Sequence, residues 1–231
     1  MQVDIIMADT SSHLLRLLHL TSPSLPTGAF AYSQGLEWAV EAGWVKTADD
    51  LQAWLADMII HTWAYVDIPI LARMVQACQK GNAARLAQLC THLLALRESN
   101  ELRMEERQRG QAMAILLQGL CDALTEEEKQ IISQCQLAGF AKAIALWNIP
   151  IHDAANGYLW SWLENQVITG IKIIPLGQTR GHQILSRLDE SIHKAVDSGL
   201  CLADEEIGAS NPALAIASNR HETQYTRLYR S

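Results

Sequence analysis

The 231-residue chain is 49% hydrophobic and acidic, with 18 Lys and Arg residues against 25 Asp and Glu and a formal net charge of −7. An acidic chain without a basic stripe is a poor nucleic-acid binder, so we expect no nucleic-acid partner. Few glycines and prolines favour helices, and because no stretch has the composition of a linker we predict one domain over residues 1–231.

The cysteines are odd in number and form no CxxC pair. They are Cys78, Cys90, Cys121, Cys135 and Cys201. Most fall on apolar helical faces, so we predict buried, reduced thiols in a cytoplasmic protein. The sequence suggests neither a secretory leader nor a membrane span, and we expect no membrane partner.

The N-terminal region begins without a pattern. Residues 1–10 are expected to fray, which gives a flexible N-terminus. Ser11 or Ser12 would cap a short helix whose leucines run from Leu14 to Leu20. This helix is apolar on most sides, so we expect it to lie deep in the fold or against a partner.

A long loop follows at residues 22–37, where Pro26 and Gly28 break any helical pattern. It carries Phe30, Tyr32 and Ser33 at its far end. A simple connection between helices is shorter and more polar. The residues support two interpretations equally: a recognition loop, or an Ω-like loop whose aromatic side chains fill their own core.

The helical pattern resumes at Leu36 and stops at Gly43, and Thr47 then caps a long apolar helix. Pro69 predicts a kink or break in that helix before it ends at Gly81. A helix around Leu86–Leu94 follows.

The next segment, Ser99–Gln111, is crowded with charges of opposite sign three or four residues apart and continues into an apolar helix. We interpret one face of it as solvated and charged. That face carries Glu98, Glu101, Glu105 and Arg109.

The second half of the chain predicts more helices. Thr125 and Glu128 form a capping box, and helical spacing recurs up to Pro150, from Asp153 to Pro175, and from Thr179 to Gly199. The sequence therefore predicts an all-α, single-domain bundle of about eight to ten helices with no sheet.

The C-terminal region departs from the helical period. Residues 204–212 are predicted to form a loop, and residues 213–231 a flexible tail. Three arginines and two tyrosines gather near its end, and these are the residue types that dominate interface hot spots. We therefore predict a segment that orders on a partner, in preference to a tail folded back on its own chain.

No catalytic or metal-binding motif is evident. The eight histidines are scattered, with no HExxH or CxxC pattern, and the stretch around Gly177 lacks the spacing of a phosphate loop. His61 lies in an apolar stripe and is predicted to be a core histidine. We predict that the chain is not an enzyme, has no catalytic residue and binds no metal or cofactor itself.

The turn near Pro175 leaves two roles open for Lys172. Its ammonium could extend to solvent from a buried helix end, or it could reach a phosphate group of a nucleotide held by a partner protein. The residues favour the structural role, because arginine suits phosphate clamping better than lysine does.

Three blocks in the same order resemble the UreF family of urease accessory proteins. The first is the loop, with Ser22, Pro26, Gly28, Phe30, Ser33, Gly35, Leu36 and Glu37. The second is Asn165-Gln166-Val167 followed by Lys172–Thr179, and the third is the tail Arg220–Ser231. Together they span nearly the whole chain.

The resemblance implies a non-enzymatic scaffold or chaperone for assembly of the nickel centre of urease. It implies a homodimer that binds a UreD-type protein (also called UreH), the GTPase UreG and the urease apoprotein, with nickel and GTP held by the partners. An alternative is a regulator of GTP hydrolysis by UreG, acting through Lys172 or Arg180.

The family pattern also implies where the partners bind. The residues expected to face the UreD-type partner are Phe30, Tyr32, Ser33, Arg220, Glu222, Tyr225, Arg227, Leu228, Tyr229 and Arg230. Those expected on the GTPase side are Lys172, Pro175, Gly177 and Gln178.

Overall fold

The computed structural model describes residues 13–121 and 124–230. The expected fraying of residues 1–10 and the cap at Ser11 or Ser12 lie outside these residues. Within them the chain is helical and contains no strand, so the predicted all-α fold is confirmed. Residues 13–21 form the predicted leucine-rich helix, whose Leu14, Leu15 and Leu18 are exposed.

The remaining helices follow in chain order. They are α2 (Leu36–Glu41), α3 (Ala48–Met58), α4 (Ile68–Gln79), α5 (Ala83–Leu96), α6 (Asn100–Leu120), α7 (Glu126–Ile132), α8 (Gln136–Leu146), α9 (Ile151–Ile173), α10 (Gln178–Cys201) and α11 (Pro212–His221). A π-helix at Ile59–Asp67 joins α3 to α4, and short 3₁₀ turns lie at Ala29–Ala31 and Asp204–Glu206.

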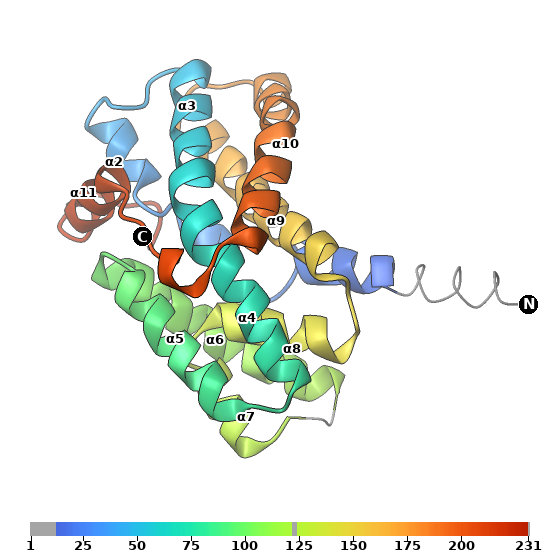
Figure 1. The fold of residues 1–231 in the computed structure, drawn as a ribbon. Helices are drawn as coiled ribbons and strands as arrows, with labels where there is room; N and C mark the ends of the chain where they lie inside the picture. Colours follow the sequence, from blue (N-terminus) through green and yellow to red (C-terminus); the bar gives the residue numbers. More distant parts are fainter. Residues whose placement is uncertain (1–12, 122–123, 231) are drawn as a thin grey trace, which may run out of the picture.

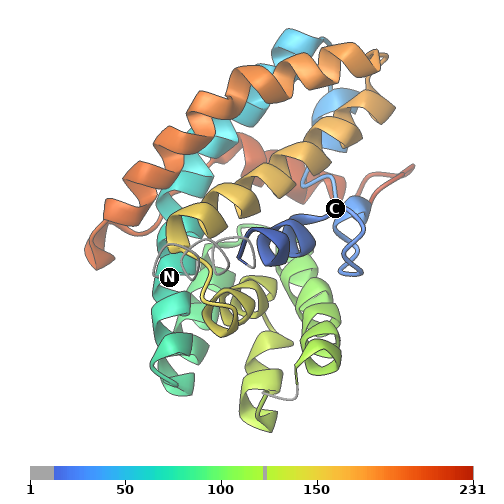
Figure 2. The ribbon, with the colours of Figure 1, turned by 90° about the vertical axis from the view of Figure 1, so that its right-hand side faces the viewer.

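One long rod built from α3, the π-helix and α4 runs through the molecule (Figure 1). Its first half packs against the antiparallel pair α9 and α10, which Figure 2 shows side by side. Its second half packs against α8 and α5, with α6 and α7 beyond. Helices α2 and α11 pack together at one edge, and the loop and tail meet there.

Pro69 explains the π-helix. A proline lacks the backbone N–H and its ring clashes with the carbonyl four residues earlier, here that of Tyr65. The chain widens so that Ile68 N–H donates to Trp63 O, and the Tyr65 carbonyl instead accepts a hydrogen bond from Gly208 N at 3.0 Å. The predicted kink is thus a widened segment inside a continuous rod. His61 lies in this segment and its side chain is exposed, so the prediction of a core histidine is wrong.

The rod Ala48–Gln79 is long and apolar enough to cross a membrane by length and composition alone. However, 61% of its most apolar window is buried inside the protein, as expected of a core helix. Thr47 caps it as predicted, since its side chain accepts from Asp50 N and the Asp50 side chain accepts from Thr47 N.

The C-terminal region differs from the sequence prediction. Residues 212–221 form α11, which begins with Asn211 as its cap and Pro212 in its first turn. Leu214, Ala217 and His221 fall on one helical face and are buried. The short length and weak apolar pattern of this helix explain why the sequence suggests a tail from residue 213, whereas the loop predicted before it is present apart from a short 3₁₀ turn.

The cysteines are all free, as predicted. Cys90 and Cys135 are buried as predicted, Cys78 and Cys121 are partly buried, and Cys201 at the end of α10 is exposed, so the prediction of a buried thiol is wrong for Cys201. Burial raises the pKa of the Cys78 thiol to about 12.

Candidate protein-interaction site

The C-terminal tail is docked on the loop of its own chain. One carboxylate, that of Glu37 in the first turn of α2, accepts hydrogen bonds from the backbone N–H groups of Leu228 at 2.7 Å and Tyr229 at 3.0 Å. Arg230 N donates to Ala31 O at 2.8 Å. The structure therefore has the arrangement that the sequence does not favour, a tail folded back on its own chain.

His221 connects this tail to two helices. Its ring is fully buried at the end of α11. Nδ1 lies 2.7 Å from Glu101 Oε2 on α6, and Nε2 lies 3.2 Å from Glu37 Oε2 on α2. Burial alone would lower the pKa of His221, but the hydrogen bonds with Glu101 and Glu37 outweigh it and raise the pKa above its usual value.

Further polar contacts fasten the tail to the start of α6. Arg227 Nη1 donates to Glu101 Oε1 at 2.8 Å. The Glu222 carboxylate accepts from Asn100 N at 2.7 Å, next to the Ser99 side chain that caps the helix by accepting from Leu102 N. A carboxylate at a helix N-terminus is stabilised by the helix dipole and satisfies otherwise unpaired N–H groups.

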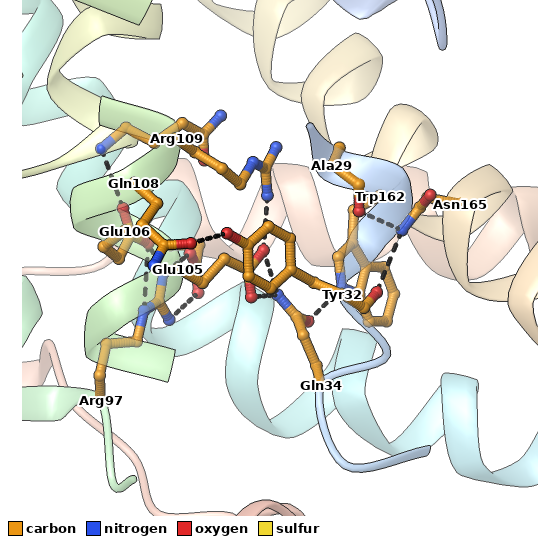
Figure 3. Close-up of polar contacts among 12 residues, drawn as sticks. Ala29, Tyr32, Gln34, Arg97, Glu105, Glu106, Gln108, Arg109, Trp162 and Asn165 are labelled. Carbon is orange, nitrogen blue, oxygen red and sulfur yellow. Dashed lines mark hydrogen bonds and ion pairs between the residues drawn. The ribbon is translucent and has the colours of Figure 1, made fainter. Parts of the chain in front are cut away.

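The inner side of the loop is held by side chains from α6 and α9 (Figure 3). Tyr32 Oη donates to Gln108 Oε1 at 2.6 Å. The Gln34 amide donates to Glu105 Oε2 at 3.0 Å and accepts from Trp162 Nε1 at 2.7 Å. These bonds fix the loop backbone, so its buried aromatic side chain serves the fold.

Beneath the loop lies a layer of buried charges, part of which sequence analysis assigned to a solvated face. Glu105 pairs with Arg109 at 2.7 Å, and Arg97 lies between Asp67 at 2.5 Å and Glu106 at 2.7 Å. The predicted solvated face is therefore wrong for Glu101 and Glu105, which are almost fully buried. The i, i+4 spacing of opposite charges in this segment was the available signal, but it does not distinguish a buried ion pair from an exposed one.

A small cavity of about 60 Å³ lies among these charges. Thr62 and Arg109 line this cavity, and Thr62 Oγ1 and Arg109 Nε are buried without a hydrogen-bond partner. Buried polar atoms of this kind are usually satisfied by internal water, and the cavity has room for it. Burial raises the pKa of Glu105 despite its pairing with Arg109.

The outer side of the loop and tail is exposed and partly apolar. Phe30 is 66% exposed, Leu228 75%, and Tyr225 fully exposed. Two grooves border the tail. One of about 500 Å³ contains Met104, Arg227 and Arg230 in its wall, and one of about 450 Å³ contains Trp44 and Tyr225. Exposed aromatic, methionine and arginine side chains around grooves are typical of protein interfaces.

The residues predicted to face the UreD-type partner thus divide into two groups. The side chains on the outer face are Phe30, Arg220, Tyr225, Arg227, Leu228 and Arg230, with Glu222 half-buried beside them. Tyr32, Ser33 and Tyr229 are buried and support this face from within. Sequence analysis did not identify Glu37 and His221 as the residues that join loop and tail.

The residues predicted for the GTPase side lie where α9 meets α10. Lys172 is exposed in the last turn of α9, where a cation is favoured by the helix dipole. Pro175, Gly177 and Gln178 are exposed around the turn that follows. In the described part of the chain, no group of three or more His, Cys, Asp or Glu side chains is placed to hold a metal ion.

Comparisons with known proteins agree with the sequence resemblance. A family model described as UreF matches residues 45–189. The chain is 48% identical over 227 residues to the urease accessory protein UreF of Alcanivorax borkumensis, covering 96% of this chain and 99% of that protein. It is 47% identical over 223 residues to the protein of the same name from Pseudomonas entomophila, covering 96% of this chain and all of that protein.

Proposed function

The chain belongs to the UreF family of urease accessory proteins, and we propose that it acts as a non-enzymatic scaffold, or chaperone, in assembly of the nickel centre of urease. In this role it works in the cytoplasm as a homodimer. Its partners are a UreD-type protein, the GTPase UreG and the urease apoprotein. Nickel is cargo, and the partners rather than this chain bind nickel and GTP.

The observation that supports the scaffold role is the exposed face of the loop and tail. Phe30, Tyr225 and Leu228 expose apolar side chains to solvent, as the residues of a protein-interaction surface do. Arginines flank them, and the backbone beneath is fixed by Glu37 and the contacts of Gln34. A rigid support lowers the entropic cost of binding, as a docking surface requires. We assign this face to the UreD-type partner.

Co-purification tests this assignment. The tagged full-length chain is expressed with a UreD-type and a UreG-type protein, and the complexes are weighed by light scattering. Leu228→Asp places a charge on the exposed face and should abolish capture of the UreD-type protein, since hot-spot changes cost about 2 kcal/mol or more.

Ile115→Asp is the matched control for this test, because Ile115 is similarly exposed on α6 but more than two helical turns beyond Met104. It should bind as the unaltered chain does. Equal capture of the UreD-type protein by the Leu228→Asp and unaltered chains would show that this face does not bind that partner. Failure of the unaltered chain to bind either partner would overturn the scaffold proposal.

The exposed position of Lys172 favours a second candidate function, regulation of GTP hydrolysis by UreG. A cation that extends from a helix end could stabilise charge on a transferring phosphoryl group in the partner. Arg180 is exposed in the first turn of α10 and is the other candidate, although it bonds Gln183.

GTP turnover measured in the assembled complex tests the regulatory role. Lys172→Ala should reduce turnover while assembly stays intact; a finger-type cation contributes about 10³–10⁵-fold. Lys80→Ala removes another exposed lysine, beyond the end of α4, and should leave turnover unchanged. An unchanged rate with Lys172→Ala would leave only the structural role for this lysine.

A further inference from the structure

His221 is held between two carboxylates that come from different helices. Nδ1 faces Glu101 on α6 and Nε2 faces Glu37 on α2, and the ring is fully buried. An ionised carboxylate only accepts hydrogen bonds, so both ring nitrogens must carry a hydrogen. The geometry therefore calls for an imidazolium ion.

The same two carboxylates hold the tail. Glu37 accepts the backbone N–H groups of Leu228 and Tyr229, and Glu101 accepts Arg227 through the oxygen that does not face His221. Two carboxylates and two cations make a neutral cluster. Loss of the imidazolium charge would leave two buried carboxylates with one arginine, which is costly in a poorly hydrated site.

The charged groups around the ring come from each element packed against it. Glu37 lies on α2, Glu101 on α6 and Arg227 in the tail, and Glu222 follows His221 directly and bonds the backbone at the start of α6. The groups that bond the His221 ring are the carboxylates of Glu37 and Glu101, and both favour the charged form of the imidazole.

We propose that the charge on His221 keeps the tail docked beside the loop, and that this docking assembles the face that the partner binds. His221 is thus a positioning residue. Glu37 is the link, because it belongs to the end of the loop motif and also bonds the tail. The second half of this inference rests on the scaffold function proposed above, whereas the first half concerns the chain alone.

The expected pH dependence has a definite sign. The docked pKa of His221 lies above its usual 6.5, so docking is fully favoured below 6.5 and is lost as the pH rises through the raised value. Between the two values the docking constant should fall about tenfold per pH unit. Tyr32 and Tyr229 do not titrate in this range, since burial raises the pKa of both above 10.

The test follows the full-length chain by NMR between pH 6 and pH 9. The ¹⁵N shifts of the His221 ring report its charge, and the amide exchange protection of Leu228 and Tyr229, corrected for intrinsic exchange, reports docking. We expect a charged ring at neutral pH and a loss of protection with the same midpoint as the ring titration.

Variants separate positioning from general stability. His221→Gln should give low protection of the two amides that does not change over this pH range. His152→Gln alters an exposed histidine that bonds Asp197 at 2.9 Å, and it should behave as the unaltered chain. Should His221→Gln fail to fold, the unaltered chain still decides the matter, because a ring that titrates without change in amide protection overturns the proposal. A ring that is already neutral at pH 6 also overturns it.

Binding of the UreD-type protein at low and high pH tests the second half. Binding should weaken in parallel with undocking in the unaltered chain and be weak at both pH values with His221→Gln. Equal binding to docked and undocked chains would overturn the claim that docking assembles the face. If the partner does not bind at any pH, the scaffold proposal fails, while the NMR result on the chain alone still stands.

Discussion

At the scale of single residues, Glu37 joins parts of the chain that are far apart in the sequence. It accepts two backbone N–H groups of the tail and faces His221 of α11, although almost none of its own surface is exposed. A buried carboxylate is tolerable only when paired and hydrogen-bonded, and this one is both.

Replacing Glu37 by alanine should therefore be severely destabilising. It would leave a buried imidazolium with one partner and two tail amides unpaired, a loss of about 3–5 kcal/mol in the free energy of unfolding. Urea denaturation measures the change. Glu190→Ala is the control, since Glu190 is exposed and forms only an i, i+4 pair with Lys194, so its midpoint should barely move. Similar midpoints for the two variants would contradict the role of Glu37.

At the scale of elements, a short helix is fastened by one ion pair. Glu128 closes the capping box of α7 and also accepts from Lys142 Nζ of α8 at 2.5 Å. The Lys142 side chain is 10% exposed, so its ammonium depends on this carboxylate. Burial would raise the pKa of Glu128, but the hydrogen bonds from Lys142 and Thr125 outweigh it and lower the pKa.

The lowered pKa gives α7 an acid-dependent contribution to stability. A carboxyl group of this kind stabilises the fold above its usual pKa of 4.5, and this contribution is lost as the pH falls through the lowered value. Glu128→Gln keeps a capping side chain but loses the ion pair, so it should be less stable at neutral pH and lose less on acidification. Thermal unfolding at a series of pH values measures both effects.

Glu126→Gln is the control, because Glu126 is exposed in the same turn and lies 3.9 Å from Lys129. The pH dependence of its unfolding should match that of the unaltered chain. If Glu128→Gln showed the full acid sensitivity of the unaltered protein, the ion pair would not be its source.

Gly35 determines how closely α2 approaches α11. Its φ of +82° lies in the left-handed region, and a Cβ atom there would meet the backbone N of Ser218 at 2.8 Å. Gly28 has a similar φ of +73°, but a Cβ atom there would meet nothing within 4 Å. Alanine at Gly28 would therefore suffer backbone strain alone, whereas alanine at Gly35 would suffer the same strain and a clash with α11.

Alanine at these two positions should have unequal effects. Gly28→Ala should cost about 1–2 kcal/mol from the left-handed backbone alone. Gly35→Ala should cost about 1–3 kcal/mol more, because α11 must shift to accept the methyl group. Urea denaturation gives the energies, and tryptic cleavage after Arg220 and Arg227 should be faster only in Gly35→Ala. Equal losses would mean that the contact with α11 yields freely.

At the scale of the whole molecule, local signals predict the fold well and the site less well. The cap at Thr47, the capping box at Thr125 and a disturbance of the helix near Pro69 are read from neighbouring residues, and the structure has each of them, the last as a π-helix and not as a break. Glu101 and Glu105 are different. Their spacing is that of a solvated face, and only the packing of the loop and tail over α6 makes them buried.

The tail is the largest difference between prediction and structure, for the same physical reason. Helix α11 is short and has a weak apolar pattern, so on its own it would be marginal in water. It is stable through contacts with residues more than a hundred positions away, such as Ser99 and Glu101. Sequence analysis singled out the outward-facing Tyr225 and Leu228, because tyrosines among arginines are typical of interfaces, but it gave no role in joining loop and tail to Glu37 and His221.

This difference predicts how the chain responds to truncation. Ending the chain after Ile216 would remove Ala217, Ser218 and His221, all fully buried, and would expose the core beneath α11. Ending it after Thr223 would keep those residues and remove only the segment bonded to Glu37 and Ala31. The shorter chain should lose both stability and partner binding, whereas the longer one should lose partner binding with a smaller decrease in stability. Urea denaturation and co-purification, performed on both, separate the two losses.

Two outcomes would contradict this account. Equal stability of the two truncated chains would show that α11 contributes nothing to the fold. Undiminished capture of the UreD-type protein by the longer chain would show that the tail contributes nothing to the interface.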